Sequence, residues 1–146
     1  MKKQTGLRAA VFIHALAVVL LQFIPGTVIS ASGVSDGAGG VKMLYRSYSF
    51  IYDFGFLWGS GSLWCPAITV LSVLTLCFTV FLLIRGREWS KIAVIVTGVL
   101  SILVLLIPII IMITDPNRFS AVQILIFALL ISETVVTAVS FRRSAK

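Results

Sequence analysis

Glu133 and His14 are the two residues of this chain whose types and setting could support chemistry. Each lies inside a long apolar run, Glu133 between 119 and 141 and His14 between about 7 and 24. A carboxyl group and an imidazole that meet in a medium of low dielectric constant titrate as a unit and can relay a proton. The alternative is structural: a hydrogen-bonded pair, or a protonated Glu133 that bonds to a Ser or Thr across a helix interface.

Both side chains are expected at a similar depth if the two runs are helices. At a rise of about 1.5 Å per residue, Glu133 is about 12 Å from the end of its run at Phe141, and His14 is about 8 Å from the end on the same side. Gln22 and Gln123 lie in the opposite half of the same two runs. We therefore interpret Glu133 and His14 as a candidate polar pair. Gln22 and Gln123 would extend it into a polar seam if the two helices pack together.

The other residue types that do chemistry are too few or too far apart to form a site. Cys65 and Cys77 are twelve positions apart on one expected helix. This is about 18 Å of rise, far beyond the Cα separation of about 7 Å that a disulfide tolerates. A single histidine and dispersed carboxylates exclude a bis-histidine haem and a zinc site. We therefore predict no enzymatic activity, no metal and no cofactor.

Composition predicts a membrane protein. Of the 146 residues, 59% are hydrophobic and 12% are charged, whereas a soluble domain has about 25% charged residues. A chain with so little charge cannot cover a water-facing surface, which excludes a soluble enzyme, a disordered tail and a nucleic-acid-binding domain. The expected partner is the lipid bilayer, with no nucleic acid.

Four apolar runs are close to the length of about 20 residues that crosses about 30 Å of hydrocarbon. They predict an all-α fold, an antiparallel bundle of four transmembrane helices that forms one membrane domain over residues 1–146. Asp115 and Pro116 match the N-cap and first turn of the fourth helix. The predicted spans are about 7–24, 64–84, 92–114 and 119–141, with an outer loop over 26–63 between the first two.

The basic residues predict the orientation of these spans. Nine of the twelve lie on one side of the predicted bundle and three on the other, and such an excess marks the cytoplasmic side. Both termini are therefore expected in the cytoplasm, most simply at the plasma membrane. The nine are Lys2, Lys3, Arg8, Arg85, Arg87, Lys91, Arg142, Arg143 and Lys146, and the three are Lys42, Arg46 and Arg118.

The first run also has a competing interpretation as a signal peptide. Lys2 and Lys3 precede it, and the small residues Ser30, Ala31 and Ser32 follow it. Cleavage after Ser32 would leave three spans in the same orientation. The run is at or beyond the 7–15 apolar residues that are usual in signal peptides, which favours a retained helix.

The outer loop divides into two parts. Residues 26–40 are rich in Gly, Ser and Ala, which indicates a flexible linker. Residues 41–58 are aromatic, with two competing periodicities: every second residue from Tyr48 onward, as in a strand, and a polar stripe at helical spacing. The stripe consists of Lys42, Arg46, Ser49 and Asp53. Because a lone two-stranded hairpin is marginal in stability, we favour an interfacial helix over 41–57.

The aromatic side chains of this second part form a candidate docking face for a partner. The alternative is a belt that anchors the loop at headgroup depth, where Tyr and Trp concentrate. The face comprises Tyr45, Tyr48, Tyr52, Phe56 and Trp58.

Small hydroxyl residues recur at steps of three and four in the two middle spans, in a pattern typical of helix-packing faces. A polar pore lining is the alternative. The residues are Thr69, Ser72, Thr75 and Thr79 in the second span, and Thr97, Gly98 and Ser101 in the third.

The layout of a larger outer loop between the first two of four spans resembles that of claudin-type tetraspan proteins. Ser62-Leu63-Trp64-Cys65 is similar to part of their Gly-Leu-Trp…Cys signature. Here, however, serine replaces the glycine, the spacing to the cysteine differs, and Cys77 falls inside a span. The resemblance therefore implies a layout and no function.

Two functional hypotheses follow. The first is a small membrane protein of accessory, scaffold or interaction type, which assembles with itself as a homo-oligomer or with a larger membrane complex. The second is a small transporter or channel subunit in which Glu133 and His14 couple transport to protons.

Overall fold

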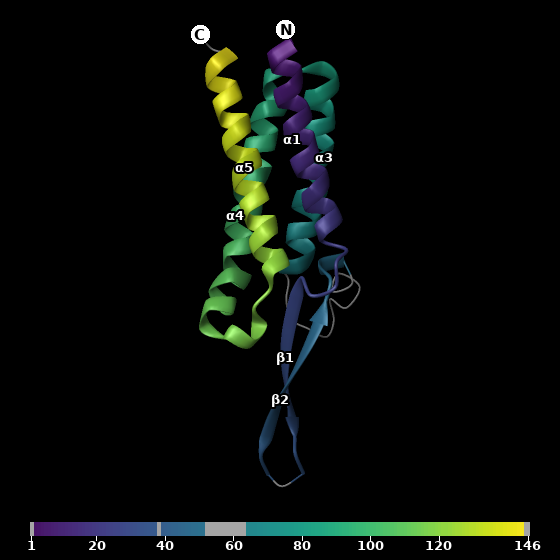
Figure 1. Ribbon diagram of the computed structural model, residues 1–146, viewed down its shortest axis with the longest axis vertical. Coiled ribbons are helices and arrows are strands. Elements are labelled where there is room, and N and C mark those ends of the chain that lie inside the picture. The colour runs from purple at the N-terminus through teal and green to yellow at the C-terminus, as the bar shows by residue number, and fades with distance from the viewer. Residues whose placement is uncertain (1, 38, 52–63, 145–146) are drawn as a thin grey trace.

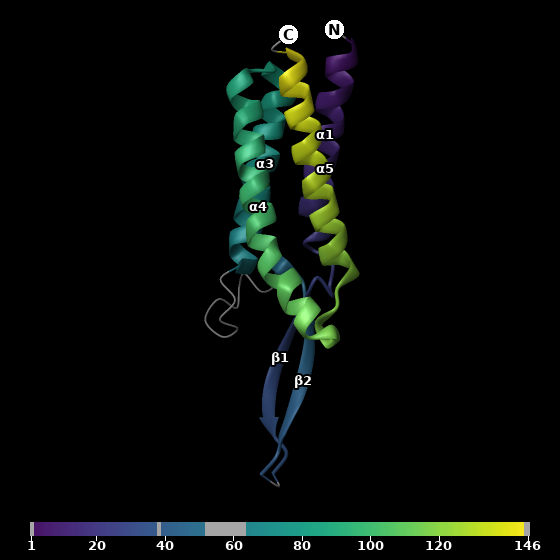
Figure 2. The same cartoon turned by 90° about the vertical axis from the view of Figure 1, so that its left-hand side faces the viewer.

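A computed structural model of the chain describes residues 2–37, 39–51 and 64–144, which are mostly helical. Long helices lie side by side, and a β-hairpin projects from one end of them (Figures 1 and 2). The elements are α1 (Lys2–Leu21), β1 (Val28–Ser35), β2 (Val41–Tyr48), α3 (Trp64–Arg85), α4 (Glu88–Thr114), the short 3₁₀ helix η1 (Pro116–Arg118) and α5 (Ala121–Ser144).

The helices form a ring in the order α1, α3, α4, α5. Each packs mainly against its two neighbours in this order, which run antiparallel to it, so that α1 lies diagonally opposite α4, and α3 opposite α5. Both termini and the α3–α4 turn lie at one end of the ring, here called the terminal end (Figure 1). The hairpin and the α4–α5 turn lie at the other, here called the hairpin end.

The residues that each helix buries follow steps of three and four. This spacing averages 3.5 residues, close to the helical period, and keeps one stripe of each helix turned towards its neighbours. In α3 the buried stripe is Cys65, Ile68, Ser72, Thr75, Thr79 and Leu82. The hydroxyl residues that the sequence assigned to packing faces in this helix and in α4 lie largely on such stripes.

Three of the helices are long and apolar enough to cross a membrane: α3, α4 and residues 121–140 of α5. Large apolar side chains point outward from them, as at Ile84 and Ile113, which are 72% and 74% exposed. The apolar part of α1, Thr5–Leu21, is shorter, so that a fourth span remains a prediction.

The interfacial helix predicted for 41–57 is wrong over residues 41–48. These residues form β2, which pairs antiparallel with β1 from Val28↔Tyr48 to Ser35↔Val41. The interpretation of 26–40 as a linker is also wrong, because this stretch supplies β1 and the turn. Gly37 and Gly39 adopt positive φ angles of 76° and 88° in the turn, a conformation that glycine adopts without steric cost. Of the remainder, Phe50 and Ile51 are helical, and residues 52–57 lie outside the described residues.

An apolar core fills the bundle towards the hairpin end. Phe50 is fully buried there and meets Trp64 edge-to-face at 5.6 Å between ring centroids. Val28 of the hairpin also enters this core, so the segment between α1 and α3 packs against that end of the bundle through Val28 and Phe50. The buried members of the apolar core are Val18, Val28, Phe50, Cys65, Ile68, Leu105, Ile126 and Leu130.

A close approach of α4 to α5 at Gly98 yields a first prediction. A Cβ added there would lie 2.5 Å from Thr134 Oγ1, which is held by its bond to the carbonyl of Leu130. Gly98→Ala should lower the free energy of unfolding by up to about 2 kcal/mol, because overpacking costs about 1–3 kcal/mol against a helix-propensity gain of about 1 kcal/mol. Unfolding in mixed detergent micelles measures this change.

The matched control is the same substitution in a Thr134→Ala background. There the obstructing oxygen is absent, so Gly98→Ala should be neutral or stabilising. A Gly98→Ala variant that is stabilised equally in both backgrounds would contradict the close approach.

Candidate polar site inside the helix bundle

Glu133 lies in the interior of the bundle. Only 1% of the Glu133 surface is exposed. The residue belongs to the buried stripe of α5, whose other members are Gln123, Ile126, Leu130 and Thr137. Among the described residues, neither of its carboxylate oxygens has a hydrogen-bond partner. A buried polar group without a partner costs free energy, so Glu133 requires an explanation.

The neighbours of Glu133 in sequence define the direction in which it points. The Ser132 hydroxyl is 3.4 Å from His14 Nε2 of α1, and Thr134 faces Gly98 of α4. Successive residues of an α-helix are rotated by about 100°. Glu133 therefore points between α1 and α4, towards the centre of the ring and the diagonally opposite helix α3.

Two pairs of contacts identify the residues at the same height along the bundle as Glu133, here called the Glu133 layer. In two antiparallel helices, residues at the same height have numbers with a constant sum. Between α1 and α5, Ser132 contacts His14, and their residue numbers add up to 146. At the hairpin end the Ser120 hydroxyl donates to the Gly26 carbonyl at 2.6 Å, and these numbers have the same sum. Between α4 and α5, the residue numbers of the contacting pairs Gly98–Thr134 and Met112–Ser120 both add up to 232. Glu133 is therefore level with residue 13 of α1 and residue 99 of α4.

The layer extends to α3 through the tight turn at the terminal end. Thr75 lies ten residues before the end of α3, and Gly98 lies ten residues after the start of α4. Both are therefore about 15 Å from the turn. The Glu133 layer thus contains Thr75 on the opposite helix, with Thr97 and Ser101 on either side of Gly98.

The structure places His14 and Glu133 at the same level but gives His14 other partners. His14 Nδ1 is 2.7 Å from the Ala10 carbonyl, which requires Nδ1 to carry a proton. In the neutral imidazole, Nε2 then accepts from the Ser132 hydroxyl. No ion pair joins His14 to Glu133 in the described part of the chain, and their role as a proton-relay pair stays a prediction.

The hydroxyl groups near the level of Glu133 already donate their hydrogen bonds to backbone carbonyls. Ser72, Thr75 and Ser101 each donate to the carbonyl four residues earlier in their own helix, at 2.8 Å. Thr97 and Thr134 do the same, at 2.9 and 2.8 Å. Such bonds leave only oxygen lone pairs free. The interior around Glu133 is therefore rich in acceptors and poor in donors.

Gln22 and Gln123 both lie near the hairpin end of the same interface. Both are buried, at 1% and 3% exposure, and their numbers add up to 145, which places them at nearly the same level. The Nε2 atom of Gln22 and the Oε1 atom of Gln123 have no partner among the described residues. The two glutamines of the predicted seam thus lie in one layer, about 15 Å from Glu133 along α5.

Ser120, which the sequence analysis missed, caps α5. Its hydroxyl accepts from the Gln123 backbone N–H at 3.3 Å and donates to Gly26. The predicted capping residue, Asp115, instead caps η1 by accepting from the Asn117 backbone N–H. A serine one residue before the helix was a signal that could have been used.

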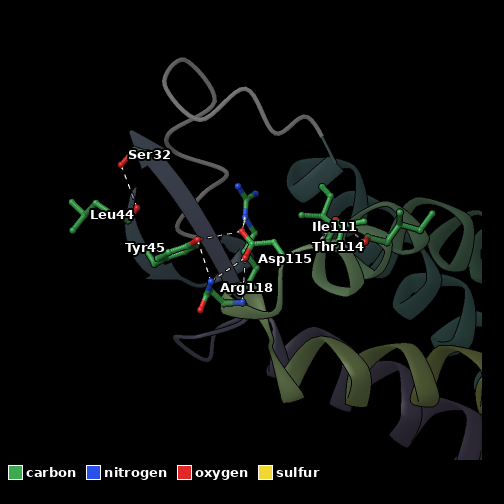
Figure 3. A network of polar contacts seen from close by, with 9 residues as sticks. Ser32, Leu44, Tyr45, Ile111, Thr114, Asp115 and Arg118 are labelled. Carbon is green, nitrogen blue, oxygen red and sulfur yellow. Dashed lines mark hydrogen bonds and ion pairs between the residues drawn. The ribbon is translucent and has the colours of Figure 1, made fainter. Parts of the chain in front are cut away.

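The candidate docking face is tied to the α4–α5 turn through Tyr45 (Figure 3). The Tyr45 hydroxyl donates to Asp115 Oδ2 at 3.5 Å and accepts from Asn117 Nδ2 at 3.4 Å. Arg118 Nε donates to the same carboxylate at 3.0 Å. Tyr48 is half-buried against the apolar core. The other members of the predicted face, Tyr52, Phe56 and Trp58, lie outside the described residues.

Neither metal chemistry nor similarity to known proteins adds a further assignment. Within residues 2–37, 39–51 and 64–144, no group of three His, Cys, Asp or Glu side chains could hold a metal ion. No protein-family model, no curated protein and no solved structure matches this chain. The function must therefore be argued from the geometry.

The bond between Ser120 and Gly26 joins the residue before α5 to the segment that follows α1, and it yields a second prediction. Ser120→Ala should lower the free energy of unfolding by about 1–2 kcal/mol, because both the helix cap and the partner of a carbonyl are lost. Ser132→Ala on the same helix is the matched control, since its contact with His14 is long, and it should cost less than half as much. Equal losses in the two variants would contradict the role of Ser120.

Proposed function

We propose that this protein is a four-helix integral membrane protein of accessory, scaffold or interaction type, without catalytic activity. Its β1–β2 hairpin would make the contact with a partner, either a second copy of the chain or a larger membrane complex. The observation that supports this proposal is the hairpin itself. It projects well beyond the helices (Figures 1 and 2), and residues 41–47 are all exposed.

The two faces of the hairpin differ in charge. Val41, Met43 and Tyr45 share one face, and Val41 and Met43 are 73% and 56% exposed. Lys42 and Arg46 lie on the other face, because successive residues of a strand alternate. Because Tyr45 already contacts the α4–α5 turn, the part of the uncharged face that a partner would cover is its distal part, at Val41 and Met43.

The hairpin also has free edges. Only β1 and β2 form a sheet in the described residues, and a two-stranded hairpin is marginally stable in water. A partner that covers the uncharged face or adds a strand to an edge would stabilise it. This requirement supports contact as the function.

The proposed setting is the plasma membrane, with four spans, both termini in the cytoplasm and the hairpin outside. Its support is the length and apolar composition of α3, α4 and α5. Exposed Arg85 and Arg87 at the terminal end also agree with the positive-inside rule.

The alternative function, a transporter or channel subunit coupled to protons through Glu133 and His14, is supported by the unpartnered carboxylate. Against it, Glu133 is sealed from solvent and His14 is engaged by Ala10 and Ser132. We therefore favour the contact function.

A photo-crosslinking residue placed at Met43 tests this proposal in membranes of the expressing cell. It should give a discrete adduct, of twice the protomer mass for a second copy or of another defined mass for a different subunit. The matched control is the same probe at Leu44, the adjacent residue on the charged face, which should give a much weaker adduct. Equal adducts from both positions, or lipid adducts alone, would contradict contact through the uncharged face.

A further inference from the structure

The carboxyl group of Glu133 faces a specific shortage of hydrogen-bond donors. Both its oxygens are buried without partners, and the nearby hydroxyls of Thr75, Thr97 and Ser101 already donate to their own helices. An ionised carboxylate can only accept hydrogen bonds, whereas a neutral carboxylic acid also donates one. The neutral form is therefore the one that buries no charge in a layer without hydrogen-bond donors.

No positive charge in the described part of the bundle compensates an ionised Glu133. On α1, His14 is occupied by Ala10 and Ser132, and the Arg8 guanidinium lies over Gly86 at the terminal end. On α4, Lys91 pairs with Glu88 at 2.8 Å and lies eight residues from the layer, about 12 Å away. Residues 64–84 of α3 carry no charge, and on residues 121–140 of α5 Glu133 is the one charged residue.

We propose that Glu133 is a proton-binding site inside the bundle, occupied at neutral pH and loaded from the terminal end. A bound proton needs no room beyond the carboxyl group itself and removes the buried charge. Release leaves a carboxylate in a low-dielectric interior without a partner, which is costly. The proton therefore stays bound in the packed state and leaves when the terminal half of the bundle opens.

The distribution of buried residues supports loading from the terminal end. Towards the hairpin end, beyond Ser72 and Ser101, the apolar core separates Glu133 from that end of the bundle. Towards the terminal end, buried polar side chains continue on three helices: Thr79 on α3, Ser90 and Lys91 on α4, and Thr137 on α5. The buried Gln22 and Gln123 lie beyond that apolar core, so the polar side chains that continue from Glu133 are those on the terminal side, and they give the proton its route.

Infrared spectroscopy of the full chain in lipid vesicles tests whether the proton is bound. The chain has two glutamates, Glu88 and Glu133, so Glu88→Gln protein labelled with ¹³C at the glutamate side-chain carboxyl carries the label at Glu133 alone. We expect the labelled C=O band of a protonated carboxylic acid at neutral pH. A labelled band of ionised carboxylate in the folded protein would overturn the proposal. This design does not depend on a Glu133 variant that folds.

Deuterium exchange into that band tests the route. In D₂O the band should shift as the proton exchanges, and the isosteric variant Thr137→Val should slow the exchange several-fold. Ser72→Ala, one turn towards the hairpin end, is the matched control and should leave the rate unchanged. A band that never shifts would overturn the site as a proton-binding site, and slowing by Ser72→Ala alone would overturn the route.

Discussion

The antiparallel contact between α1 and α5 is the interaction on which the rest of the bundle depends. A tight turn joins α3 to α4 and η1 joins α4 to α5, so those pairs are neighbours in sequence. α1 is separated from α3 by residues 22–63 and must find its place through contacts that are distant in sequence. The bonds from Ser120 to Gly26 and from Ser132 to His14 set its register against α5.

This register brings the polar residues of the interior into layers. Gln22 and Gln123 lie in one layer near the hairpin end, and His14, Glu133 and Gly98 lie in another near the middle. The α1–α5 contact also holds the start of the hairpin against the apolar core through Val28. A bundle closed in this way projects the hairpin from one end and isolates Glu133 in its interior.

The sequence predicted the long helices well, because twenty or more apolar residues leave little ambiguity. The predicted spans 64–84 and 92–114 agree closely with α3 and α4. The hairpin was missed because Gly-rich and Ser-rich composition resembles a linker, which left residues 41–48 without a visible partner strand. The bond from Tyr45 to Asp115 joins residues 70 positions apart, and no local pattern could indicate it. Glu133 and His14 could be placed at a similar depth by counting residues, but their partners depend on side-chain packing.

The register of α1 against α5 is tested most directly by cross-linking in membranes. In a chain with Cys65 and Cys77 replaced by alanine, cysteines are placed at His14 and Ser132, or at His14 and Leu125, two turns away on the same face of α5. A short thiol-reactive linker should join the first pair within one chain and not the second. Equal joining of both pairs, or joining only between chains, would contradict the register and with it the layers built on it.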